Sequence, residues 1–256
     1  MKVSRLNPRL ESTFWEHITQ DVPHYFFFIS DMKHERAVTE VWLALDDENG
    51  IRGLMLIYRG RIVQLRGSIE AVRVLLDRLT LKEGEVTGEP EHRVLIMERF
   101  RVEASSELTL MALRRGEETP QVRHRVHRLS SAEAGYIAHL MRVGDPVWWG
   151  QVTVERIAER LNERLWLGVR ADGRLVSAGG AMVDDWAGLI TTVVTHPSYR
   201  GRGYATSIVS ALVREILERS RLALIYVRSD NLPALRVYHK VGFKPCREYF
   251  MARVRG

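Results

Sequence analysis

A short segment rich in glycine and arginine holds the residues best suited to chemistry. It runs Tyr199-Arg200-Gly201-Arg202-Gly203-Tyr204, directly after the β-branched stretch Leu189–Thr195 and before a long amphipathic pattern. Glycines let the backbone approach a ligand closely, and free N–H groups at the start of a helix favour negative charge. Two arginines add cations at the same place. The segment therefore predicts a pyrophosphate-binding loop between a strand and a helix.

Two other phosphate-binding motifs do not fit this loop. A Walker loop needs a Gly-Lys-Ser/Thr sequence, which does not follow these glycines. The dinucleotide fingerprint needs a different glycine spacing and a strand that opens a βαβ unit. Here the strand instead follows two strands that the turn Ala171-Asp172-Gly173 joins as a hairpin. A lone Gly-x-Gly is weak, so the prediction needs a second motif.

That second motif lies one predicted helix and one predicted strand further along the chain. It runs Asn231-Leu232-Pro233-Ala234-Leu235-Arg236-Val237-Tyr238-His239-Lys240-Val241-Gly242-Phe243. Asn231 is a good helix N-cap, proline is tolerated in the first turn, and Gly242 ends the helix. Spacings of three and four place Asn231, Ala234 and Tyr238 on one helical face. The motif predicts a helix that presents a tyrosine beside a small residue.

Together the two motifs resemble the acyl-CoA-binding signature of the GNAT superfamily of N-acyltransferases. Arg200-x-x-Gly203-x-Ala205 is similar to its phosphate loop, and the second motif is similar to Asn-x-x-Ala-x-x-x-Tyr-x-x-x-Gly-Phe. The resemblance covers about Val122–Gly256. It implies an α+β fold with a mixed central sheet flanked by helices, acetyl-CoA or CoA as cosubstrate, and no metal.

The resemblance also implies the site residues. Backbone groups at the end of the strand would hold the pantetheine arm, and the loop amides would bind the pyrophosphate. The cofactor-binding residues are then Val193, Val194, Thr195, Arg200, Gly201, Arg202, Gly203, Tyr204, Ala205, Thr206 and Asn231. Tyr238 would protonate the departing thiolate, since a thiol and a phenol have pKa values of about 8.5 and 10. The alternative is that Tyr238 only packs on the cofactor or the sheet.

The base that deprotonates the acceptor amine stays open. Many relatives place a carboxylate on the strand before the loop, but Leu189–Thr195 contains none. The nearby acids lie in a turn or on a helix surface, where acids are usually solvated: Asp184, Asp185, Glu155 and Glu159. A water relay through Thr191 or Thr192 is an equal alternative. Trp148 and Trp149 could either wall an acceptor pocket or pack in the core.

The chain has 256 residues, enough for two domains, and the polar stretch Arg114–Pro120 predicts the boundary. We expect domains at 1–118 and 119–256. Both halves show the order three strands, helix, strand, helix, strand, which suggests a diverged tandem duplication. In the N-terminal half the loop Leu65-Arg66-Gly67-Ser68-Ile69 has one glycine, and the late helix Glu89–Phe100 has no tyrosine. We therefore predict that this half does not bind CoA.

Composition narrows the remaining classes of partner and cellular location. A net charge of +6 suits a polyanionic partner, either nucleic acid or a phosphorylated cofactor. The arginines are scattered and no recognition motif is present, so we rank nucleic acid last. No stretch is long and apolar enough for a bilayer or a secretory signal, which predicts a cytoplasmic protein without membrane contact. The single cysteine, Cys246, and the lack of Cys/His clusters argue against disulfides and zinc.

The sequence thus predicts an acyl-CoA N-acyltransferase, monomeric or homodimeric. It would transfer an acetyl or other short acyl group from acetyl-CoA to an amine acceptor, by direct attack in a ternary complex. The alternative is a catalytically silent acyl-CoA-binding sensor, which the missing strand carboxylate favours.

Overall fold

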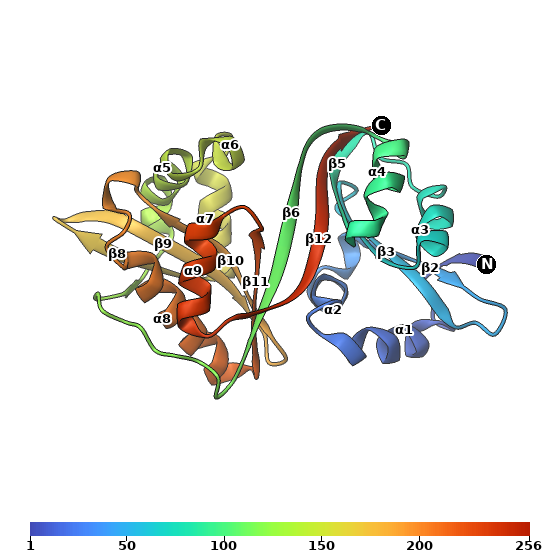
Figure 1. Cartoon of the computed structure of the whole chain (residues 1–256), viewed down its shortest axis with the longest axis horizontal. Helices are drawn as coiled ribbons and strands as arrows, with labels where there is room; N and C mark the ends of the chain where they lie inside the picture. The colour runs from blue at the N-terminus through green and yellow to red at the C-terminus, as the bar shows by residue number, and fades with distance from the viewer. The chain divides into compact units, whose positions relative to one another are not determined.

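The computed structural model describes the backbone of residues 1–256 and the side chains of all residues except Val147 and Trp148. Contacts between Cα atoms divide the chain into two compact units. Unit 1 comprises Met1–Thr109, Arg228–Asp230 and Arg247–Gly256, and unit 2 comprises Leu110–Val227 and Asn231–Cys246. Three strands, β6 (Arg101–Arg114), β11 (Leu222–Arg228) and β12 (Lys244–Arg255), have residues in both units (Figure 1). The domain boundary between residues 118 and 119 stays a prediction.

Unit 2 is built on a mixed sheet with the strand order β6-β11-β10-β9-β8-β7. Besides β6, this sheet contains β7 (His127–Arg128), β8 (Leu165–Ala171), β9 (Arg174–Val183), β10 (Gly188–Thr195) and β11 (Leu222–Arg228). Strands β7 to β10 pair antiparallel in sequence order, whereas β10 and β11 pair parallel. The predicted hairpin joins β8 to β9 through Asp172 and Gly173, whose φ angles are 50° and 73°. Positive φ at both turn residues matches the twist of the strands.

Helices cover both faces of this sheet (Figure 1). α8 (Tyr204–Arg219) and α9 (Leu232–Val241) share one apolar cluster with the strands, and α5 (Ala134–Gly144) and α7 (Val154–Glu163) share another. The side chains of β10 alternate between the two, since Val193 packs on the α8 side and Val194 on the α5 side. Short helical segments complete the unit: η4 (Ser131–Glu133), α6 (Pro146–Trp149) and η5 (Pro197–Tyr199).

Unit 1 has the strand order β1-β2-β3-β4-β5-β12-β6. Its own strands are β1 (Lys2–Arg5), β2 (Thr39–Leu45), β3 (Ile51–Tyr58), β4 (Ile62–Gly67) and β5 (Glu83–Gly88). Strands β1 to β4 pair antiparallel, β4 and β5 pair parallel, and β5 pairs antiparallel with β12. The helical segments are α1 (Glu11–Ile18), η1 (Thr19–Asp21), α2 (Phe26–His34), η2 (Arg36–Val38), α3 (Ile69–Leu76), η3 (Pro90–His92) and α4 (Arg93–Arg99).

The mixed sheet with flanking helices is confirmed, as is the order three strands, helix, strand, helix, strand in each half. Within Val122–Leu129 only His127 and Arg128 form a strand, β7. The preceding residues are held by serines of α8 instead. The hydroxyl oxygens of Ser207 and Ser210 accept from the backbone N–H groups of Arg123 and Gln121, at 3.0 and 2.9 Å.

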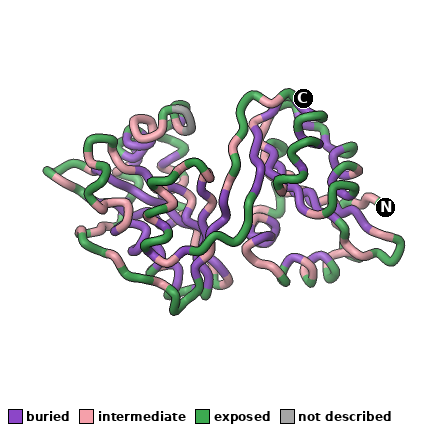
Figure 2. The backbone as a smooth tube through the Cα atoms, viewed as in Figure 1, coloured by how far each residue is buried: buried purple, intermediate pink, exposed green. Residues whose placement is uncertain are grey.

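Buried residues follow the strands and the inner faces of the helices, whereas the turns are exposed (Figure 2). In unit 1 the main apolar cluster joins β2 to β5 with α3 and α4, through residues such as Met55, Val72 and Ile96. Among the residues that the structure describes, no helix is long and apolar enough to cross a membrane.

Candidate functional site

β10 and β11 pair for only three residues and then separate. Their parallel register ends at the pair Ile190 and Ile225. β10 nevertheless goes on pairing with β9 as far as Thr195, past a bulge between Ile190 and Thr192. The backbone edge of β10 that faces β11 is therefore open after Ile190. The predicted strand residues Val193, Val194 and Thr195 all lie in this open part.

The predicted phosphate loop follows directly and ends on a helix N-terminus. Gly201 and Gly203 have φ angles of 78° and 84°, a region that residues with a side chain rarely adopt. Gly203 is the N-cap of α8 and has no side chain to bond the first turn. The bond from Ser207 N–H to Gly203 O, at 3.1 Å, is the first of the helix. The N–H groups of Tyr204, Ala205 and Thr206 are therefore open to an external acceptor.

Arginine and aromatic side chains surround this loop. Arg200 donates to the carbonyl oxygen of Gly144 at 2.6 Å, and the guanidinium of Arg202 lies 5.2 Å from the centre of the Tyr199 ring. Neither arginine forms an ion pair with a carboxylate among the described side chains. The positive charge of the loop is thus not neutralised by these neighbours, which favours an anionic ligand.

Sequence reasoning missed one neighbour of the loop, His124. Its Nε2 lies 2.8 Å from the carbonyl oxygen of Arg202, and its ring centre lies 4.3 Å from that of Tyr204. The contact joins residues 78 positions apart, through an irregular segment before β7. Only a pattern of serines on α8 facing an irregular segment could have signalled it.

The second motif forms α9 as the sequence predicted. The side-chain oxygen of Asn231 accepts from Ala234 N–H at 3.2 Å, and Gly242 ends the helix with a φ of 113°. Tyr238 is 6% exposed and packs edge-on against Phe243, with ring centres 6.1 Å apart. Burial raises the pKa of Tyr238 above its ordinary value. The phenol is therefore protonated at neutral pH, as a proton donor must be, although it is a weaker acid.

The four acids considered as bases are not buried beside the strand end. Glu155 and Glu159 are exposed on α7, Asp185 is exposed and Asp184 half-buried in the turn between β9 and β10. Hydrogen bonds from its own backbone N–H and from Thr153 hold the pKa of Glu155 below its usual range. Carboxylates in such positions are solvated, and none of the four gains support as the base.

One of the two tryptophans considered for an acceptor pocket, Trp149, packs in the core. Trp149 packs against the apolar cluster of α5 and α7, and the Arg160 guanidinium lies 6.0 Å from its ring centre. The side chain of Trp148 lies outside the described residues. Core packing therefore accounts for Trp149.

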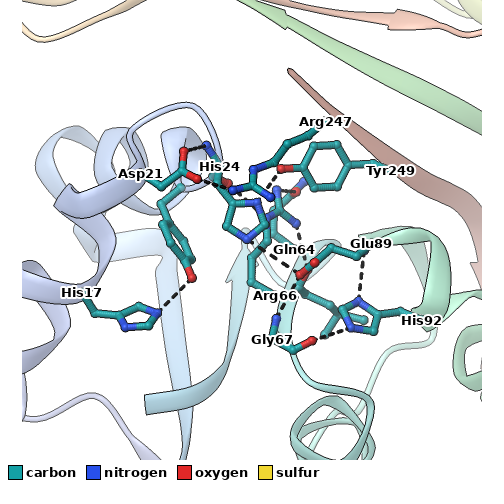
Figure 3. Close-up of polar contacts among 12 residues, drawn as sticks. His17, Asp21, His24, Gln64, Arg66, Gly67, Glu89, His92, Arg247 and Tyr249 are labelled. Carbon is teal, nitrogen blue, oxygen red and sulfur yellow. Dashed lines mark hydrogen bonds and ion pairs between the residues drawn. The ribbon is translucent and has the colours of Figure 1, made fainter. Parts of the chain in front are cut away.

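The equivalent place in unit 1 is filled by the chain's own side chains (Figure 3). β4 and β5 also pair for three residues, up to Gln64 and Thr87, and then separate. Beyond this point Gly67 N–H donates to Glu89 Oε1 at 3.1 Å, and Gly67 O lies 2.8 Å from His92 Nε2. The backbone groups that are open in unit 2 are therefore occupied here.

A buried arginine completes this closed end of unit 1. Arg66 is 1% exposed and donates to the carbonyl oxygens of His24 and Leu65, at 3.0 and 2.8 Å, and to Gln64 Oε1 at 3.3 Å. Its guanidinium lies 4.3 Å from the ring centre of Tyr249, whose hydroxyl lies 2.7 Å from His24 Nδ1. Figure 3 shows these side chains converging from separate segments, with the ion pair of Asp21 and Arg247 beside them. We call Gln64, Arg66, His24, Tyr249, Glu89 and His92 the closed cluster.

Comparisons with known proteins agree with this geometry. The sequence model of the Acetyltransferase (GNAT) family matches residues 135–243. N-alpha-acetyltransferase RimI of Mycobacterium tuberculosis is 32% identical over 125 residues, which are 45% of this chain and 75% of that protein. A Drosophila protein structure matches with a TM-score of 0.75 at 12% identity, over 98% of both chains. A GNAT-family acetyltransferase of Colwellia psychrerythraea matches with a TM-score of 0.57 at 12% identity, over 100% of both chains.

The mixed sheet with flanking helices is the fold that these solved structures share, and the similarity to RimI shows the family. The chain belongs to the GNAT acetyltransferase family, whose members use acetyl-CoA as cosubstrate. The two structural likenesses, both at 12% identity, show the fold over nearly the whole chain and nothing finer.

Proposed function

We propose that unit 2 transfers an acetyl or other short acyl group from acetyl-CoA to an amine, by direct attack in a ternary complex. The observation that carries this proposal is the separation of β10 from β11 after Ile190, directly beside a helix that begins on Gly203. The open strand edge supplies backbone groups for the amides of the pantetheine arm. The open helix N-terminus supplies N–H groups for the pyrophosphate.

The residues around the opening have separate roles in this proposal. Arg200 and Arg202 add positive charge where the phosphates would lie. Acetyl-CoA supplies an acyl group already activated as a thioester. Tyr238, kept protonated by burial, donates its proton to the leaving thiolate. The acceptor must attack the thioester as a neutral amine, since an ammonium has no lone pair for attack.

The acceptor to test first is the α-amine of a peptide. The relative RimI is named an N-alpha-acetyltransferase, and its similarity spans 125 residues of this chain. An α-amine has a pKa of about 8, against about 10.4 for lysine, so more of it is neutral at pH 7. A panel of peptides, amino acids and small amines therefore ranks the acceptor classes directly.

For unit 1 we propose a diverged second copy of the same fold that does not bind CoA. The repeated order of elements and the repeated parallel strand pair support the duplication. The closed cluster supports the loss of binding, because Glu89 and His92 already occupy the backbone of Gly67.

A charge substitution in the phosphate loop tests the cofactor site. Gly203→Glu places a carboxylate at the start of α8 and should weaken CoA binding by about 100-fold or more, since opposing like charges costs several kcal/mol. Gly116→Glu is the matched control, because Gly116 also has a positive φ, 92°, and open space around it. Calorimetric titration of CoA measures both variants. Equal affinities for CoA would contradict the site.

A thiol-release assay with acetyl-CoA and the amine panel tests turnover and Tyr238. Tyr238→Phe should lower kcat by about 100-fold without changing CoA affinity, because proton transfer contributes 10²–10⁴-fold. Unchanged turnover in this variant would remove the proton-donor role. Tight CoA binding without turnover on any amine would favour the alternative, a silent acyl-CoA sensor, for which the missing carboxylate on β10 is the supporting observation.

A further inference from the structure

Three cross-strand neighbours form a row across β8, β9 and β10. Trp166 pairs with Gly180, and Gly180 pairs with Thr192. Cross-strand partners stand on the same face of a sheet with Cβ atoms about 5 Å apart. Trp166 belongs to the apolar cluster of α5 and α7, so the row stands on the face that these helices cover.

The glycine in the middle of the row lets the tryptophan lean toward the threonine. A Cβ built on Gly180 would lie 2.7 Å from Cε2, 2.9 Å from Cδ2 and 3.0 Å from Cζ2 of Trp166. The indole ring therefore lies across the space that a side chain at Gly180 would need. Cε2 is bonded to Nε1, so the N–H group is next to this contact.

Both polar atoms of the row are buried without a hydrogen-bond partner among the described residues. These atoms are Trp166 Nε1 and Thr192 Oγ1, in side chains of residues that are 1% and 6% exposed. The neighbouring Thr191, by contrast, donates to Gly180 O at 3.2 Å. An unsatisfied buried polar group is costly, so two of them in one row point to a bound atom that satisfies both.

The chemistry of the two groups selects the kind of atom. An indole N–H only donates, whereas a hydroxyl donates or accepts. An ammonium cannot accept from the indole, but an oxygen can accept from Trp166 and also bond Thr192. A water molecule is small enough for a position covered by α5 and α7, and buried waters serve such groups in other proteins.

The row lies where the proposed reaction needs a proton acceptor. Thr192 is the second residue after Ile190, the last residue of β10 that pairs with β11. The bound oxygen would therefore lie at the inner end of the opening between the two strands. It would be on the face opposite to α8, because Val194, on the same side of β10, packs with α5.

We propose that Trp166 and Thr192 position a water molecule that takes the proton from the acceptor ammonium. This inference rests on the proposed function of unit 2. One lone pair of the water accepts from Trp166 Nε1–H, and the other accepts the ammonium proton. An N–H bond of the ammonium breaks, an O–H bond forms on the water, and the nitrogen keeps its lone pair for attack. The water donates a hydrogen bond to the Thr192 hydroxyl, and the proton it has gained passes to bulk water through the opening between β10 and β11, so the row keeps no charge.

No buried acid or base from the packed elements competes with this role among the described side chains. β10 has no titratable residue. The titratable groups of α5, α7, β8 and β9 are all exposed or half-buried: Tyr136, His139, Arg142, Glu155, Arg156, Glu159, Arg160, Glu163, Arg170 and Arg174. A neutral relay therefore suits this face better than a carboxylate base.

The pH profile of kcat/KM for the acceptor tests the relay. Thr192→Val keeps the shape of the side chain and should lower kcat/KM about 100-fold at pH 7. The loss in kcat/KM should disappear at pH values above the pKa of the free amine, because no proton then has to be removed. Thr192→Ser should restore most of the activity, and Trp166→Phe should show a smaller loss of the same pH dependence. Thr191→Val is the control for removing a threonine hydroxyl from β10 and should keep the profile of the wild type.

Two results would overturn the relay. One is a Thr192→Val profile parallel to that of the wild type at every pH, and the other is a raised KM for the acceptor alone, which would make the row an acceptor-binding site. The thermal shift induced by CoA checks that each variant is folded and binds the cofactor.

A crystal structure separates failure of the relay from failure of the proposed function. If the wild type acetylates no amine, the proposed function fails. The electron density beside Trp166 and Thr192 then still tests whether an oxygen is bound there. An oxygen within about 3.2 Å of both Trp166 Nε1 and Thr192 Oγ1, lost in Thr192→Val, supports the binding position. Absence of that oxygen in the wild type overturns it.

Discussion

The two parallel strand pairs of this protein, β10–β11 and β4–β5, separate at equivalent places but end in opposite ways. In unit 2 the backbone edge of β10 stays open, and α8 begins on Gly203, which has no side chain to cap it. In unit 1 Glu89 and His92 bond the backbone of Gly67, and Ser68 caps α3 through a bond from Ala71 N–H at 3.3 Å. A few side chains thus decide whether the same backbone frame serves a ligand or closes on itself.

The difference also predicts what mutations will cost. The closed cluster buries a guanidinium whose hydrogen bonds all go to neutral oxygens, an arrangement that is stable only when complete. In unit 2 the corresponding backbone groups belong to the proposed ligand site. Substitutions should therefore cost folding stability in unit 1 and ligand affinity in unit 2.

The largest expected effect is that of Arg66→Met. The variant leaves three buried acceptor oxygens without their donor, and we expect a loss of about 3 kcal/mol in the stability of unit 1. Hydrogen–deuterium exchange of peptides from β4, β5 and α4 measures this loss, while exchange in unit 2 should stay unchanged. Arg73→Met is the control, because the Arg73 side chain on α3 is 60% exposed.

The same variant can also break the comparison. If Arg66→Met left the hydrogen exchange of unit 1 unchanged, the cluster would not be needed for the stability of this unit. If it gave a second bound CoA per chain in calorimetry, the cluster would be covering a working cofactor site. A stoichiometry of one CoA per chain, with weaker protection in unit 1, keeps the two ends distinct.

Local patterns were enough to predict the frame of both units. The alternating apolar residues gave the strands, and glycines, serines and asparagine marked helix ends such as Ser68, Asn231 and Gly242. These signals worked because caps and turns depend on residues that are neighbours in the sequence. The loop from Arg200 to Thr206 could be predicted for the same reason.

The contacts that distinguish the two ends could not be predicted in this way. His24 and Tyr249 meet across 225 positions, and Trp166 and Thr192 share a row only because strand pairing places Gly180 between them. Arg66 stood in the predicted loop Leu65–Ile69, whereas the structure places it in β4, where it bonds Gln64 and Leu65 of the same strand and the distant His24. Side-chain closure of the β4–β5 end depends on tertiary register, which sequence periodicity does not contain.

A smaller effect, dependent on pH, comes from His24. Burial, with added repulsion from Arg66, Arg247 and nearby histidines, lowers the pKa of His24 to about 2. The Glu89 carboxylate, 3.7 Å away, does not reverse this direction because burial dominates. In the unfolded chain His24 therefore binds a proton at about pH 6.5, whereas in the folded chain it stays neutral at that pH. Stability from this group is complete above that pH and falls as the pH drops, by about 2 kcal/mol at pH 5.

Exchange measurements at pH 7 and pH 5, corrected for intrinsic rates, test this prediction. His24→Asn keeps a hydrogen-bonding group and removes the titration, so the pH dependence in unit 1 should flatten. His139→Asn is the control, because His139 is exposed on α5. An unchanged slope in His24→Asn would mean that another group of the closed cluster takes up the proton.

The smallest effect tests the helix starts, where the contrast is between Ser68 and Gly203. Ser68→Ala removes the cap of α3 and should cost about 1 kcal/mol, whereas Ser68→Gly should cost only a few tenths. Exchange of α3 amides measures both, with Ser105→Ala, at an exposed position of β6, as the control. If Ser68→Ala loses the full 1 kcal/mol or so of stability, the cap contributes to the closed end of unit 1. If α3 is unaffected, its N-terminus is as open as that of α8, and the difference between the units rests on Glu89 and His92 alone.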